Sequence, residues 1–177
     1  MKIEEYNKFY HVDISTQINN KWKDNTFLAI VKDSRRYSIM IKGRDKEELK
    51  KRFLVDETEW YNKIHNKKVI ALIYSYLLYK ALCEFQEAKP LLLCRDVRPE
   101  KFVMNYFQKI TAFFKNYNIS ERTVKFRKRV EFETRDKLPK SLAGKYARKV
   151  YQGRLPAIKT LNSEEIHELN NLISKLL

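Results

Sequence analysis

The chain has 177 residues, of which 44% are hydrophobic and 13% aromatic, and its formal net charge is +15, from 37 Lys and Arg against 22 Asp and Glu. This fraction of hydrophobic residues excludes a chain that is mainly disordered, and it is sufficient to form the core of one domain. The charge attracts polyanions, so composition favours nucleic acid as the partner and an anionic membrane surface second, with a generally basic, solvated surface as the plain alternative.

Cysteine usage and hydropathy point to a reducing, aqueous compartment. Cys83 and Cys94 lie in apolar runs without a His or Cys at metal-ligand spacing, so we expect buried thiols rather than a disulfide or zinc framework. The N-terminus lacks the apolar segment of a signal peptide, and the longest apolar stretch, residues 69–82, is too short to span a bilayer. We therefore predict a soluble, cytoplasmic protein with no membrane partner.

Three strands are predicted in the first quarter of the chain. Residues 9–16 alternate apolar and polar side chains, and residues 26–32 and 37–42 are rich in strand-forming residues. Residues 33–36, between the second and third strands, have the length of a hairpin connection. The three strands are therefore expected to form an antiparallel meander.

The middle of the chain is predicted to be mainly helical. A charged helix is expected over residues 44–51 and a long helix with a broad apolar face over residues 60–87, either continuous or broken near Asn66. Residues 91–97 begin with an unbroken apolar run, which is typical of a strand covered on both faces. A helix with an aromatic stripe begins at Pro99.

The last third contains one more strand and two helices. Residues 123–133 alternate an apolar and a charged face, as a half-buried strand does. Residues 138–151 are expected to form a basic helix, and residues 164–176 a final helix with Ser163 as its N-cap. Because Ile166 follows three residues after Ser163, a simple cap is predicted rather than a capping box.

Two aspartates stand out because solvation alone does not explain their positions. Asp13 lies in the middle of the first strand, and Asp96 follows the apolar run of the strand at residues 91–97. Carboxylates on neighbouring strands can hold a divalent metal between them. Each aspartate alone also has an ordinary explanation, Asp13 as a polar residue on a half-open sheet face and Asp96 as a helix N-cap. The functional hypothesis therefore rests on the pair.

The order of these elements resembles that of the ribonuclease H-like superfamily over about residues 9–151. The resemblance lies in three antiparallel strands, a helical segment, a strand ending in Asp, a helix, a strand and a helix, and in the placement of Asp13 and Asp96. It implies an α/β fold with a ribonuclease H-like mixed sheet, in which the meander is followed by two further strands with intervening helices. We predict a single domain over residues 1–177, with the helix at about 164–176 packed on its core.

The resemblance also implies a catalytic metal site. Members of the superfamily bind magnesium or manganese through a cluster of acids on the sheet, so Asp13 and Asp96 are the implied catalytic residues and metal ligands. A glutamate of the intervening helix is expected to join them. Glu59 is the first choice, and Glu48 and Glu57 are alternatives.

The sequence departs from the superfamily pattern at the last helix. Many members carry a further Asp, Glu or His there, whereas this chain has Gly144 and Lys145 at the corresponding place and Asp136 just upstream. The sequence is therefore compatible with two interpretations, a metal site of three acids or a protein that keeps the fold but has lost catalysis.

Positive charge is concentrated in residues 122–154, which hold twelve Lys or Arg against three acids. The charged face of the predicted strand and the basic helix after it can together follow a phosphate backbone. A solvated charged face is the alternative. The candidate nucleic-acid-binding residues are Lys125, Arg127, Arg129, Lys140, Lys145, Arg148 and Lys149.

Two functions follow from these features. The first is a Mg²⁺- or Mn²⁺-dependent nuclease, or a related nucleic-acid-processing phosphoryl-transfer protein, of ribonuclease H-like fold. The alternative is a non-catalytic, basic nucleic-acid-binding protein on the same or a similar α/β fold. The nuclease hypothesis has a geometric requirement, which is that the strands carrying Asp13 and Asp96 are neighbours.

Overall fold

The computed structural model describes residues 8–15, 18, 21–84, 90–93, 99–120, 124–126 and 142–177. Its strands are β1 (Tyr10–Ser15), β2 (Thr26–Lys32), β3 (Arg35–Ile41), β4 (Leu91–Leu93), β5 (Val124–Phe126) and β6 (Lys159–Thr160). Within the described residues they form one six-stranded sheet in the order β5-β4-β1-β2-β3-β6. Together with the helices this makes an α/β protein, as predicted.

The sheet is antiparallel in its centre and parallel on both sides. β1 pairs antiparallel with β2, and β2 antiparallel with β3, which confirms the predicted meander. β4 lies parallel to β1 and β5 parallel to β4, whereas β6 extends the opposite edge parallel to β3. The two strands that follow the meander in sequence, β4 and β5, therefore extend the sheet from β1.

The connection between β2 and β3 is tighter than predicted. Lys32 pairs with Arg35, so only Asp33 and Ser34 remain in the turn. Asp33 has a φ of 52°, in the left-handed region that Asp and Asn tolerate better than most residues. The strand β3 consequently starts at Arg35 rather than Tyr37, and its register places Arg36 directly opposite Val31.

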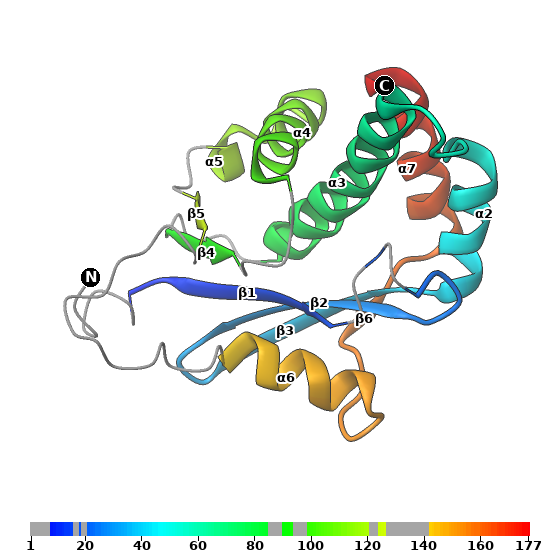
Figure 1. Ribbon diagram of the computed structural model, residues 1–177. Coiled ribbons are helices and arrows are strands. Elements are labelled where there is room, and N and C mark those ends of the chain that lie inside the picture. The colour runs from blue at the N-terminus through cyan, green and yellow to red at the C-terminus, as the bar shows by residue number, and fades with distance from the viewer. Residues whose placement is uncertain are drawn as a thin grey trace, which may run out of the picture.

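Helices cover both faces of the sheet (Figure 1). They are α2 (Gly43–Phe53), α3 (Trp60–Cys83), α4 (Glu100–Phe113), α5 (Tyr117–Ser120), α6 (Leu142–Tyr151) and α7 (Ser163–Leu176). Figure 1 shows α2, α3, α4 and α7 on one side of the sheet and α6 on the other. Successive strand residues follow this division, since Leu28 and Ile30 join the core around α3, whereas Ala29 and Val31 join a second cluster with α6.

The long helix is continuous at Asn66, since α3 runs without interruption from Trp60 to Cys83. The Asn66 side chain accepts a hydrogen bond from the Val55 N–H at 3.0 Å and donates one to the Val55 carbonyl at 2.9 Å. It therefore fixes the connection between α2 and α3 instead of ending the helix. From Val69 to Leu82 almost every residue is buried, as expected for a helix enclosed by the sheet and by other helices.

Two predictions about single residues are wrong. The N-cap of α7 is Asn162 rather than Ser163, and the Glu165 carboxylate accepts from the Asn162 N–H while Asn162 Oδ1 accepts from the Glu165 N–H, which makes a capping box. Cys83 is exposed rather than buried, because it lies at the last residue of α3, where the buried part of the helix has ended. Cys94 lies outside the described residues.

No helix in the described part of the chain is both long enough and apolar enough to cross a lipid bilayer.

Candidate nucleic-acid interface

Asp13 lies on the sheet face that α6 covers. Side chains alternate along β1, so Tyr10 and Val12 enter the core around α3 and Asp13 points the other way. Asp13 pairs with Ala29, which belongs to the cluster under α6. Its side chain is half-buried, and Oδ1 accepts a hydrogen bond from the Ile14 N–H at 2.8 Å.

The strand that precedes Asp96 is the neighbour of β1. β4 lies parallel to β1, with Tyr10 opposite Leu91 and Val12 opposite Leu93. Asp96 itself lies outside the described residues. The structure therefore meets the requirement for neighbouring strands, and whether the two carboxylates converge stays a prediction.

The candidate glutamates are exposed and belong to the opposite side of the sheet. Glu48 is in α2, Glu59 immediately precedes α3, and Glu57 accepts a hydrogen bond from Asn66 Nδ2 at 3.0 Å. Because α2 and α3 cover the face opposite α6 (Figure 1), none of them shares a sheet face with Asp13. Among the described residues, no three His, Cys, Asp or Glu side chains gather as a metal site requires. Those residues alone therefore do not fit a magnesium or manganese site.

The helix α6 has one apolar and one basic side. Its buried positions recur at intervals of three and four residues, and two of them are alanines, so the helix lies close to the sheet. Lys145, Arg148 and Lys149 are exposed on its outer side. The cluster between α6 and β2 consists of Phe27, Ala29, Val31, Ala143, Tyr146, Ala147 and Val150.

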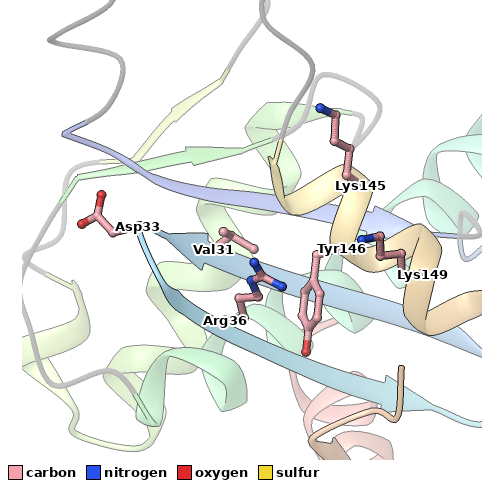
Figure 2. Close-up of a pocket in the computed structure, with 6 residues that line it drawn as sticks. All are labelled: Val31, Asp33, Arg36, Lys145, Tyr146 and Lys149. Atoms are coloured by element: carbon pink, nitrogen blue, oxygen red, sulfur yellow. The ribbon is translucent and has the colours of Figure 1, made fainter. Parts of the chain in front are cut away.

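A pocket of about 150 Å³ lies where α6 meets the β2–β3 hairpin (Figure 2). Lys145 and Lys149 are one helical turn apart, so both side chains reach it from α6. The lining includes three cations and one acid, a formal charge of +2. The lining residues are Val31, Asp33, Arg36, Lys145, Tyr146 and Lys149.

Arg36 and Tyr146 contact each other in the lining of the pocket. The Arg36 guanidinium lies 6.0 Å from the centroid of the Tyr146 ring, in cation–π contact. Tyr146 is buried, and its hydroxyl lies 3.4 Å from Ser38 Oγ, which accepts a hydrogen bond from the Ile158 N–H at 3.1 Å. The ring is therefore held in place by its surroundings, whereas the cations around it are exposed.

The predicted basic residues are only partly placed by the structure. Lys145, Arg148 and Lys149 share the outer side of α6, as predicted, and two of them line the pocket. Arg127, Arg129 and Lys140 lie outside the described residues. Lys125 belongs to β5, at the far edge of the sheet from β3, and nothing is described of its side chain.

Sequence reasoning missed Arg36 as a candidate. It was assigned to the connection between two strands, whereas it lies within β3 opposite Val31. A two-residue turn at Asp33 and Ser34 would have given this register and placed Arg36 on the same sheet face as Val31. The contact with Tyr146 joins segments about 110 residues apart and has no local signal.

Comparison of the chain with protein-family profiles, curated protein sequences and solved structures finds no match.

Proposed function

We propose that this protein binds nucleic acid through the α6 surface, defined as Arg36, Lys145, Arg148 and Lys149. The observation that carries the proposal is that Arg36, Lys145 and Lys149 line one pocket, from two elements that are distant in sequence. Lys and Arg are the usual partners of phosphate oxygens. The net charge of +15 adds a long-range attraction for any polyanion.

The residues of the α6 surface have different roles in this proposal. The Lys145 and Lys149 ammonium groups, one turn apart, can contact neighbouring phosphates of one strand. The Arg36 guanidinium is planar and can donate two parallel hydrogen bonds to one phosphate. Arg148 is exposed beside them without lining the pocket, so it contributes charge.

The arrangement of the sheet supports a ribonuclease H-like scaffold for this function. The antiparallel meander is followed by β4 beside β1 and β5 beside β4, in agreement with the element order of that superfamily. The helix α6, where the superfamily often carries a further acid, lies on the same face as Asp13. The chain has Gly144 and Lys145 where the resemblance places that acid, and Lys145 is exposed on the outer side of the helix.

The binding proposal predicts a specific loss when α6 loses charge. Fluorescence anisotropy with labelled oligonucleotides should give a binding constant that falls steeply between about 50 and 200 mM salt. The double variant Lys145→Gln with Lys149→Gln should bind about tenfold more weakly, and its log–log salt slope should be smaller by about 1.5, for two lost phosphate contacts.

The matched control is Lys63→Gln with Lys67→Gln, which removes two exposed charges at the same spacing from α3 on the other side of the sheet. Its affinity should stay within about twofold of wild type, since the charge is lost away from the contact. Equal losses in the two double variants would mean that net charge alone drives binding and would refute a role for the α6 surface.

A metal-dependent nuclease is the second candidate, favoured by the parallel pairing of β1 with β4. A bound Mg²⁺ or Mn²⁺ would supply an activated water and relieve charge at the phosphate. Asp13 is the ligand that the described residues offer, and we assign no catalytic step to it, because a metal cluster is not formed by those residues alone. Asp96 would have to complete the site.

The nuclease candidate is tested by incubating labelled DNA and RNA, single-stranded and duplex, with Mg²⁺ or Mn²⁺ and either wild type or Asp13→Asn. Cleavage by wild type that is lost in the variant, with binding unchanged, would establish the enzyme and its substrate. Salt-sensitive binding by both proteins without cleavage would leave the binding function alone.

A further inference from the structure

We infer that the pocket between α6 and the β2–β3 hairpin takes one unpaired nucleotide, so that the protein prefers single-stranded to duplex nucleic acid. This inference rests on the proposed function, and it specifies the ligand of the same surface. The inference is based on the size of the pocket and on its lining, which has an apolar part that a phosphate-binding site does not need.

The pocket has an apolar inside and a cationic rim. Val31 and the Tyr146 ring are buried residues of the cluster under α6, and both line the pocket. Lys145 and Lys149 reach it from the exposed side of α6. A ligand that fits has a flat, weakly polar part to lie against the walls and a negative part to meet the ammonium groups, which is the chemistry of a nucleotide.

The size of the pocket favours the same ligand. Its volume of about 150 Å³ is about ten times that of the smallest cavity that holds one water molecule. This is larger than one phosphate group and is of the order of a nucleobase. A phosphate alone would leave the apolar wall uncovered and would lose part of its hydration against Val31.

Arg36 provides an exposed planar group for stacking, and the buried Tyr146 ring lies behind it. The Arg36 guanidinium lies 6.0 Å from the centroid of the Tyr146 ring. Arg36 belongs to β3, whereas Val31 on the pocket wall belongs to β2. Aromatic rings and guanidinium planes are the usual stacking partners of unpaired bases. Figure 2 shows Asp33 apart from this pair, at the hairpin end of the pocket, so its carboxylate does not separate the cations from the ring.

Electrostatics alone predicts the opposite preference. A duplex carries the higher charge density, and each neutralised phosphate contributes more to binding there. The slope of log K against log salt concentration is about −0.9 per phosphate for a duplex and about −0.7 for a single strand. Its bases are stacked and cannot enter a pocket. A preference for the single strand therefore reports contact with bases, whereas a preference for the duplex reports contact with phosphates only.

The test measures anisotropy at one salt concentration with three probes of one length, namely a single strand, its duplex, and a strand whose nucleotides are abasic. Wild type should bind the single strand at least about fivefold more tightly than the other two, the effect of one stacked base. Arg36→Lys keeps the charge but lacks the plane. It should lose most of this preference, so that its affinities for the three probes become similar.

The control is Arg44→Lys, which makes the same change at an exposed residue of α2 on the other side of the sheet and should keep the full preference. Equal binding of the three probes by wild type, or an unchanged preference in Arg36→Lys, would overturn the inference while leaving nucleic-acid binding in place. If none of the three probes binds in a salt-dependent way, the proposed function fails and the inference fails with it.

Discussion

At the scale of single residues, Glu165 links the C-terminal helix to the rest of the fold. Its carboxylate lies 2.8 Å from Lys159 Nζ and 3.2 Å from Lys80 Nζ, and it also completes the capping box of α7. Burial alone would raise the pKa of Glu165, but the hydrogen bonds from Lys159, the Asn162 N–H and Lys80 outweigh it and hold the pKa below its ordinary value. The ionised form therefore stabilises the folded protein.

Glu165→Gln should lower the free energy of unfolding by about 2 kcal/mol at pH 7, because Gln keeps the capping box but loses both ion pairs. Since the folded protein depresses the pKa, this stabilisation is complete above the ordinary value of about 4.5 and is lost as the pH falls through and below it. Urea unfolding of wild type and variant from pH 7 to pH 3 measures the difference.

The neighbouring Glu164→Gln is the control for that measurement, because Glu164 is exposed in the same helical turn. It should change stability by less than about 0.5 kcal/mol at every pH. If wild type and Glu165→Gln differed by a constant amount down to pH 3, the ion pairs with Lys80 and Lys159 would not be the source of the stabilisation.

Residue types predicted some of these features and missed others for identifiable reasons. Asp13 was placed correctly in mid-strand, because alternation along β1 is a local signal. The N-cap of α7 was misplaced by one residue, since Asn162 and Ser163 are both good caps and only the contact between Asn162 and Glu165 decides between them. Cys83 is exposed because α3 extends there beyond the elements that pack on it, and the apolar run in the sequence does not indicate where that packing stops.

At the scale of elements, the start of α2 is fixed by a close approach to the connection between β1 and β2. A Cβ built on Gly43 would lie 1.8 Å from the Lys23 carbonyl oxygen, which is a backbone atom that cannot rotate away. The Gly43 N–H also donates to Asn25 Oδ1 at 2.9 Å. Glycine is thus required at position 43 because a side chain has no room there, and not because the backbone adopts a positive φ.

Gly43→Ala should therefore cost about 3 kcal/mol, because the connection or the helix must shift to admit one methyl group. Gly153→Ala is the comparison, since Gly153 has a φ of +69° and nothing within 4 Å of an added Cβ, so that only backbone strain of about 1 kcal/mol opposes it. Thermal unfolding of both variants checks the order, and a Gly43→Ala protein as stable as Gly153→Ala would contradict the close approach.

The type of each element with a clear hydrophobic periodicity was predicted well, but the residues at which these elements begin and end were predicted less well. Residues 26–32 form β2 as expected, whereas β3 begins two residues early because the turn shortens to Asp33 and Ser34. The long helix ends at Cys83 rather than near residue 87, whereas the basic helix ends at Tyr151 as predicted and its predicted first residues, 138–141, lie outside the described residues. Hydrophobic periodicity sets the type of an element, but neighbours decide where pairing stops.

At the scale of the whole molecule, the candidate site depends on contacts that no single segment contains. The pocket requires Arg36 from the hairpin and Lys149 from α6, brought together by the cluster of Ala29, Ala147 and their neighbours. The sequence indicated positive charge in the last third of the chain, but it gave no sign that α6 would cover the face of β2 and β3. The α/β sheet was predictable, and the pocket was not.

Mapping the contact on the protein itself is the most direct test of nucleic-acid binding by the α6 surface. Hydrogen–deuterium exchange would be compared with and without a saturating, short single-stranded oligonucleotide at low salt. We expect slower exchange over residues 31–36 and 142–151, with α3, α4 and α7 unchanged. Protection confined to those three helices, or no protection anywhere, would contradict binding at the α6 surface.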